Sequence, residues 1–192
     1  FPGLLGHGEG VTRLNAPTRL PSTLGDERAV SVSAGWSHSL ALTAHGSVWS
    51  WGDGCFGKLG HGDQQDQLLP KKIEAFADQR VVAVSAGREH SLALAADGAV
   101  WRWGFGLLSQ LGHEAELDEW QPKKIEGFAG QRVVAVSAGG LYSLALTSSG
   151  AVWSWGYGDF GQLGHGDQQD QLLPKKIEAL ACHSVVAVLA GA

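Results

Sequence analysis

The chain has 192 residues, with 14 lysine and arginine residues against 19 aspartate and glutamate residues, and a formal net charge of −5. This acidic balance argues against nucleic acid as a direct partner, because affinity for phosphate requires a basic face. The two cysteines, Cys55 and Cys182, do not form a disulfide framework, and no apolar run reaches membrane length or forms a signal-peptide pattern. We therefore expect a soluble protein of the cytoplasm or nucleus that does not contact membranes.

A repeat with a step of 52 residues organises the sequence. The string VWSWG begins at Val48 and at Val152, and its near copy VWRWG begins at Val100. Self-similarity at this spacing is typical of repeat architectures, in which each unit buries its apolar face against a neighbour. We divide the single repeat domain, residues 1–192, into a tail over residues 1–16, three units over 17–69, 70–121 and 122–173, and a partial unit over 174–192.

The unit over residues 70–121 predicts about four short strands. Their sequence signals, in chain order, are the segment Pro70–Ile73, the β-branched run Val81–Val84, the alternation around Leu92–Leu94, the hairpin signal Asp97–Gly98 and the segment Val100–Trp103. No helical periodicity separates them, and four antiparallel strands in one repeat of this length are typical of a β-propeller blade. The sequence therefore predicts an all-β chain of propeller blades.

The number of repeats predicts a partial ring. Closed propellers typically have 4 to 8 blades, and this chain holds enough sequence for about three and a half. We expect it to be a piece of a longer ring, or an arc with open ends. Uncovered blade faces and strand edges promote association, so self-association through the open ends is also expected.

Four ordered motifs resemble the regulator of chromosome condensation repeat family. They are VVAVSAG at Val81–Gly87, the HSLAL stretch with its following DG at His90–Gly98, VWSWG at Val48–Gly52 and FGQLGHG at Phe160–Gly166. The resemblance covers nearly the whole chain. It implies a seven-bladed propeller in which one sequence repeat spans parts of two blades.

The resemblance also implies a range of functions. The family includes an exchange factor for the Ran GTPase, propellers attached to HECT-type ubiquitin ligases, a plant ultraviolet-B photoreceptor and scaffolding proteins, and fold alone does not choose among these roles. We predict a non-catalytic protein-interaction scaffold whose partner is a protein, such as a small GTPase or a basic protein surface. The alternatives are guanine-nucleotide exchange on a Ran-like GTPase and the regulatory propeller of a HECT-type ubiquitin ligase.

No catalytic, cofactor-binding or metal-binding residues are predicted. The histidines that recur in LGH are His61, His113 and His165, with His7 as a fourth copy. Equivalent positions in successive blades lie too far apart to share one ion, since zinc ligands lie within about 2.0–2.2 Å of the metal. We therefore expect these histidines to hold glycine-rich loops by hydrogen bonds. The glycine-rich segment over residues 52–62 lacks the ending and the following helix of a phosphate-binding loop.

Six of the eight tryptophans form the repeated WxW pairs, and their period predicts core packing between blades. These are Trp49, Trp51, Trp101, Trp103, Trp153 and Trp155. Trp36 breaks the repeat and is a candidate partner-binding residue. Its segment GWSHS is similar to the motif that carries the light-sensing tryptophans of the photoreceptor. Because Arg88 and Gly140 occupy the equivalent positions, photoreception is not expected from this segment.

The loop between Gly104 and Pro122 departs from its two sister loops of the same length. It carries four acidic residues and a tryptophan, which are Glu114, Glu116, Asp118, Glu119 and Trp120. An acidic loop that ends in an exposed tryptophan predicts a binding surface for a basic partner. The alternative is a solvated loop with the tryptophan packed on its own blade. Arg102 replaces the serine of the sister repeats, and we expect it to stack on the neighbouring tryptophans.

Overall fold

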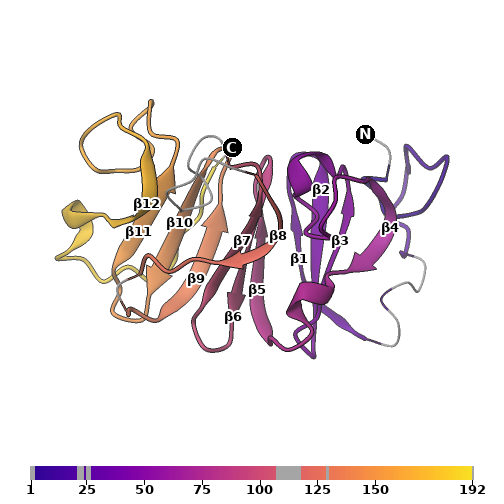
Figure 1. Cartoon of the computed structure of the whole chain (residues 1–192), viewed down its shortest axis with the longest axis horizontal. Coiled ribbons are helices and arrows are strands. Elements are labelled where there is room, and N and C mark those ends of the chain that lie inside the picture. Colours follow the sequence, from indigo (N-terminus) through magenta and orange to yellow (C-terminus); the bar gives the residue numbers. More distant parts are fainter. Residues whose placement is uncertain (1–2, 21–23, 25–26, 107–117, 129, 192) are drawn as a thin grey trace.

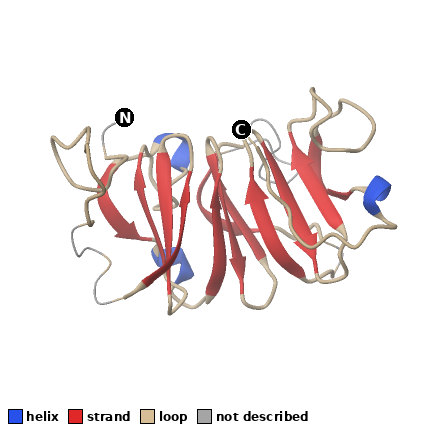
Figure 2. Ribbon diagram, turned by 180° about the vertical axis from the view of Figure 1, so that it is seen from behind, coloured by secondary structure: helices blue, strands red, loops and turns tan. Residues whose placement is uncertain are grey.

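The computed structural model describes residues 3–20, 24, 27–106, 118–128 and 130–191 (Figure 1). The described residues form three four-stranded antiparallel sheets, and the helical segments are the short 3-10 turns Cys55–Gly57, Glu74–Phe76 and Glu178–Leu180. The three sheets stand side by side along the long axis of the molecule (Figure 2). The prediction of all-β propeller blades of four strands in a partial ring is therefore confirmed.

Each sheet is one blade, and its strands follow in chain order. The first blade contains β1 (Ala29–Ala34), β2 (His38–Thr43), β3 (Val48–Gly52) and β4 (Gln67–Lys72); the second contains β5 (Val81–Ala86), β6 (His90–Ala95), β7 (Val100–Gly104) and β8 (Glu119–Lys124); the third contains β9 (Val133–Ala138), β10 (Tyr142–Thr147), β11 (Val152–Gly156) and β12 (Gln171–Lys176). This up-and-down order matches hairpin connections, which join antiparallel neighbours without crossovers.

The sequence repeat and the blade are out of phase. The unit boundaries at residues 69–70, 121–122 and 173–174 fall inside β4, β8 and β12. The long loop after each third strand returns the chain to the outer edge of the same sheet before it enters the next blade. The repeat drawn from the sequence therefore begins within the last strand of the preceding blade.

Aromatic side chains fill the space between successive blades. Phe76, which follows β4, packs edge-on against Trp101 and Trp103 of the second blade, with both pairs of ring centroids 5.7 Å apart. Phe128 packs in the same way against Trp153 and Trp155 of the third blade, at 5.8 and 5.7 Å. Edge-to-face geometry at these distances is favourable beyond the area that it buries. These contacts fix the position of each blade against the next.

The second tryptophan of each pair is the more deeply buried one. Trp103 and Trp155 are fully buried, and Trp51 is 6% exposed. The indole nitrogen of Trp103 donates to the backbone carbonyl of Lys58 at 2.8 Å, and that of Trp51 donates to the carbonyl of Leu4 at 3.2 Å. Each indole thus holds the loop of a preceding segment of the chain.

Candidate interaction surface

We call the first strand of each blade, β1, β5 or β9, its inner strand. The turns that follow the inner strands form a continuous row across the three blades. Each turn donates one backbone N–H to a carbonyl of the next turn, so that repeat-equivalent residues become neighbours in space. These bonds are Trp36 N to Gly87 O at 3.3 Å, Arg88 N to Gly139 O at 3.2 Å and Gly140 N to Gly191 O at 3.2 Å. A step of 52 residues in the sequence is therefore one step along this row.

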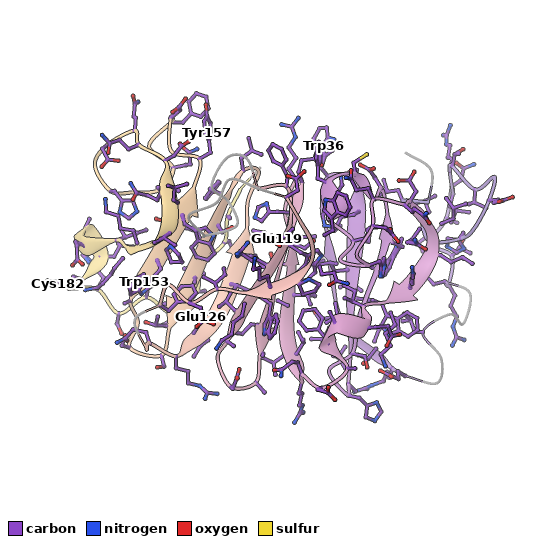
Figure 3. The ribbon with its side chains drawn as sticks, viewed as in Figure 1. Trp36, Glu119, Glu126, Trp153, Tyr157 and Cys182 are labelled. Atoms are coloured by element: carbon purple, nitrogen blue, oxygen red, sulfur yellow. The ribbon has the colours of Figure 1, made fainter. Side chains whose placement is uncertain are left out.

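Trp36 and Arg88 contact each other in this row. The guanidinium carbon of Arg88 lies 5.2 Å from the ring centroid of Trp36, within the range of a cation–π interaction. Trp36 is 61% exposed, so the pair is presented to solvent. Figure 3 shows Trp36 and Tyr157 at the same end of the sheets. The pair combines an exposed tryptophan and an arginine, two residue types that are enriched at interface hot spots.

A cavity of about 590 Å³ lies beside this pair. It is lined by the inner-strand ends and turns of all three blades, over residues 34–36, 86–88 and 138–142, and by Tyr157, Phe160 and Gln162 from the last long loop, with residues 190–191 closing the row. Its volume falls within the range of about 300–1,000 Å³ that is common for ligand pockets. Glycine, alanine and aromatic residues dominate the lining, and Arg88 is the one lysine, arginine or acidic residue among the described residues that line it.

A buried ion cluster lies next to the Trp36–Arg88 pair. The ammonium of Lys58 donates to Asp53 Oδ2 at 2.6 Å, to Glu89 Oε2 at 2.5 Å and to Ser37 Oγ at 3.0 Å. Lys58 is fully buried, whereas the side chains of Asp53 and Glu89 keep 13% and 21% of their exposure. All three ammonium protons therefore have acceptors, as a buried charge requires.

The electrostatics of the cluster favour the charged form of the Asp53 carboxylate. Burial alone would raise the pKa of Asp53, but hydrogen bonds from Lys58, Cys55 and Ser37 outweigh burial and hold that pKa well below its usual range. Asp53 therefore stays ionised, and the cluster keeps its ionic character at physiological pH.

The sequence carries a signal for this cluster. At the repeat step, Ser37 corresponds to Glu89 and Leu141, and Asp53 corresponds to Phe105 and Tyr157. The acidic residues and Lys58 thus depart from the repeat at one blade junction. The contact between Trp36 and Arg88 was missed, although equivalent positions of neighbouring blades are adjacent in a propeller.

His61 and His165 of the LGH motif lie within hydrogen-bond distance of serines of the strands that precede their loops. His61 Nε2 lies 3.0 Å from Ser50 Oγ, which donates to Leu59 O at 2.7 Å, and burial lowers the pKa of His61 to about 4. The third blade repeats this arrangement with His165 and Ser154 at 3.0 Å. His113 lies outside the described residues. Within the part of the chain that the structure describes, no group of three or more histidine, cysteine, aspartate or glutamate residues could hold a metal ion.

The acidic segment before Pro122 makes contacts within the chain where it is described. Glu114 and Glu116 lie outside the described residues. Asp118 accepts the N–H of Gly106 at 3.0 Å, and Glu119 accepts from Lys123 Nζ at 2.8 Å. None of the three described members of the segment lines the cavity. The segment is thus separate from the Trp36 surface.

Trp120 lies against the neighbouring blade, and not only against its own. It is 45% exposed, its carbonyl accepts the N–H of Gly62 at 2.9 Å, and its Cα lies beside Gly57. Both glycines belong to the long loop of the first blade. Part of the Trp120 ring is therefore available to a partner, while its backbone joins two blades.

Arg102 does not stack on the tryptophans that flank it. Successive side chains of a strand point to opposite faces, so Arg102 and its two neighbours on β7 lie on different faces. Among the described residues, the cation–π contacts are instead those of Lys58 with Phe56 and of Arg88 with Trp36. Arg102 is 2% exposed, and its Nη1 lies 3.9 Å from Glu119 Oε1. Burial lowers the pKa of Arg102 to about 10, although Glu119 acts in the opposite direction.

Three four-stranded antiparallel sheets, joined in sequence and packed through repeated tryptophans, define a segment of a β-propeller. The chain belongs to the RCC1-like domain family, whose pattern it matches over residues 3–192. The resemblance to the regulator of chromosome condensation repeat family is thereby confirmed.

Several known proteins are similar to this chain. The human E3 ubiquitin-protein ligase HERC2 is 40% identical over 98% of this chain and 4% of its own length. The ultraviolet-B receptor UVR8 of Arabidopsis thaliana is 38% identical over 98% of this chain and 42% of its own length. The crystal structure of Prp20p from Saccharomyces cerevisiae superposes with a TM-score of 0.77 at 25% identity, over 84% of this chain and 41% of that one.

The chain spans less than half the length of each of these relatives. Its RCC1-like propeller fold supports a protein-interaction module, and the fold does not select a specific role. No helix among the described residues has the length and apolar character needed to cross a membrane.

Proposed function

We propose that this chain is a non-catalytic scaffold module that binds a protein partner through the face formed by Trp36, Arg88 and the adjoining cavity. The observation that carries the proposal is the Arg88 guanidinium 5.2 Å from the ring of a tryptophan that is 61% exposed, beside a cavity of about 590 Å³. A rigid propeller that presents such a pair on its turns can bind by surface complementarity alone. We place the module in the cytoplasm or nucleus.

Affinity capture with matched variants tests this proposal. The chain would be immobilised as wild type, Trp36→Ala and Arg88→Ala, and captured proteins from cytosolic and nuclear extracts would be quantified by mass spectrometry. Loss of a hot-spot side chain costs about 2 kcal/mol, or roughly 30-fold in Kd. We expect one set of proteins to be depleted on both variants.

Lys175→Ala is the control, because Lys175 is exposed on β12 and does not line the cavity. This variant should capture the same proteins as the wild type. An identical captured set on wild type, Trp36→Ala and Arg88→Ala would contradict the proposed surface.

A role as the propeller of a HECT-type ubiquitin ligase is the second candidate. Identity of 40% to human HERC2 over 98% of this chain favours it, together with 38% identity to the probable ligase HERC3 of Homo sapiens. Sequencing of the full transcript tests it: a reading frame that continues into a HECT-type domain supports the ligase role, and a complete frame without that domain removes it.

Nucleotide exchange is tested separately. The solved structure of Prp20p is described together with its binding to Gsp1p and to histones. We expect the chain to leave the release of fluorescent GDP from a purified Ran-like GTPase at the intrinsic rate. Acceleration of that release would replace the scaffold role with an exchange role, and its partner would then be the small GTPase.

A further inference from the structure

The buried ammonium of Lys58 is hydrogen-bonded to the residue that follows each member of the exposed pair. Ser37 follows Trp36 and accepts from Lys58 Nζ at 3.0 Å, while Glu89 follows Arg88 and accepts at 2.5 Å. The two turns belong to different blades, so one side chain bridges them. Lys58 thus links the side chain after Trp36 to the side chain after Arg88.

Further hydrogen bonds fix both turns to the cluster. Asp53 Oδ2 accepts from Lys58 Nζ at 2.6 Å and from Ser37 Oγ at 2.9 Å, and the Asp53 N–H donates to Ser37 O at 2.9 Å. On the other blade, the N–H of Phe105 donates to Glu89 O at 2.9 Å. The side chains beside Trp36 and Arg88 therefore have little freedom to rotate or shift.

The next blade junction shows that such a cluster is not needed to join two blades. There, Phe105 and Leu141 occupy the positions of Asp53 and Glu89, so both carboxylates are replaced by apolar side chains. Gly140 occupies the position of Arg88 in that row and presents no side chain. The ionic cluster thus occurs at the junction that carries the Trp36–Arg88 pair.

The energetics of a buried ion pair also separate two roles, which are to hold blades together and to fix the geometry of the groups that it joins. A buried ion pair is often no more stabilising than apolar residues of similar volume, because both charges lose their hydration. Its directional hydrogen bonds nevertheless require one arrangement of the groups that they join. The burial of Lys58 with three hydrogen-bond partners is therefore better explained by a need to fix geometry than by a gain in the stability of the fold.

We propose that Lys58 is a positioning residue that holds Trp36 and Arg88 together as one recognition unit. This proposal rests on the proposed function, in which that pair contacts the partner. Lys58 itself is buried and touches no ligand. It acts through Ser37 and Glu89, and it sets the distance between the indole ring and the guanidinium.

The indole N–H signals of the eight tryptophans in a ¹H–¹⁵N spectrum test the proposal without a partner. Trp36→Phe identifies the Trp36 signal, and Arg88→Ala gives the shift expected when the stacked guanidinium is removed. We expect Lys58→Gln and Glu89→Gln each to move the Trp36 signal toward its position in Arg88→Ala. The Trp155 signal, identified with Trp155→Phe, should stay in place as a check on the fold of the third blade.

Lys71→Gln is the matched control, because it makes the same chemical change at an exposed lysine of β4. It should leave the Trp36 signal unmoved. The double variant Lys58→Gln with Glu89→Gln should shift the signal by less than the sum of the single shifts, since both changes break the same contact. Glu89→Gln removes the carboxylate charge that pairs with Lys58 and keeps the size of the side chain, so it tests the proposal even if Lys58→Gln does not fold.

Two results would overturn the positioning role. One is a Trp36 signal that stays at its wild-type position in Glu89→Gln while it moves in Arg88→Ala. The other is a Trp36 signal that does not move in Arg88→Ala, which would mean that the stacked pair is absent in solution. A capture experiment in which no protein depends on Trp36 would count against the proposed function and leave the positioning result intact.

Discussion

Two buried histidines join successive blades through single side-chain contacts. His38 Nε2 lies 2.8 Å from Ser91 Oγ of the second blade, and His90 Nε2 lies 3.0 Å from Ser143 Oγ of the third. Both imidazoles are fully buried, and neither Nδ1 atom has a hydrogen-bond partner among the described residues. A second proton on either ring would be a buried charge without an acceptor, so both rings are neutral in the folded chain.

This neutrality predicts a loss of stability in mild acid. Burial is the main cause that lowers the pKa of His38 to about 3 and of His90 to about 4, from an ordinary value of 6.5. The unfolded chain therefore binds protons below pH 6.5 while the folded chain does not, and stability falls as pH drops from 6.5 toward 4. Each histidine contributes up to about 1.4 kcal/mol per pH unit in that window.

Urea denaturation at pH 7.5, 6.0 and 5.0 measures this effect. The free energy of unfolding of His38→Gln should depend less steeply on pH than that of the wild type, because glutamine does not titrate. His45→Gln is the control, since His45 is exposed. Equal pH dependence in the wild type and in His38→Gln would refute this account of the buried ring.

The long loop of the first blade lies close against the second blade at Gly57. A Cβ atom on Gly57 would lie 2.5 Å from the Cα of Trp120 in β8, closer than real Cβ contacts allow. Gly161 is the repeat-equivalent residue in the third blade, and a Cβ there would meet only Asp167 O at 3.9 Å. The two glycines have nearly the same backbone angle, with φ at +73° and +72°.

Alanine at these two positions separates backbone strain from contact between blades. Both Gly57→Ala and Gly161→Ala place a side chain in the left-handed region, at a cost of about 1–2 kcal/mol. Gly57→Ala also forces the loop away from β8, so we expect its urea midpoint to fall further than that of Gly161→Ala. Equal midpoints would show that the loop can separate from the second blade without cost.

The strands were predictable from the sequence because their signals are local. Alternation around Leu92 and Leu94 and the WxW pairs specify strand faces, and β6 and β7 occur where these patterns lie. The fourth strand was less clear, since Pro70–Ile73 captured only the end of β4. That strand is defined by its pairing with β3, which depends on the intervening loop.

The candidate surface was only partly predictable for a physical reason. Trp36 was selected because it breaks the repeat, but its contact with Arg88 depends on how two blades pack. The sequence alone does not identify Lys58, because a lysine in a glycine-rich loop is typical of a solvated position. One acceptor of its buried ammonium is Glu89, which belongs to the second blade and lies near Lys58 only when the two blades pack together.

At the scale of the whole molecule, the inner strand of a blade supplies one apolar residue that covers the preceding blade. Val84 of β5 packs against the core between the first and second blades, and Val136 of β9 packs against the next core. Val188 packs in the same way against the core of the third blade. Val32 is their repeat equivalent in β1, and it is 71% exposed. The first blade therefore presents an uncovered apolar face.

This uncovered face predicts self-association of the 192-residue chain. Contact between Val32 and an apolar surface of a second copy would cover the side chain, as the equivalent valines Val84, Val136 and Val188 are partly buried by packing. Light scattering after size exclusion should show a molar mass that rises above 20.2 kDa with protein concentration. Val32→Ser should reduce that rise.

Val30→Ser is the matched control on the same strand. Val30 is 50% exposed, and its equivalents Val82 and Val134 remain 47% exposed although neighbouring blades are present. Exposure at this position is therefore a property of the inner strand and not of the open end, so Val30→Ser should associate like the wild type. A wild-type mass of 20.2 kDa at every concentration would mean that the first blade is stable with Val32 in water, and that association does not depend on this face.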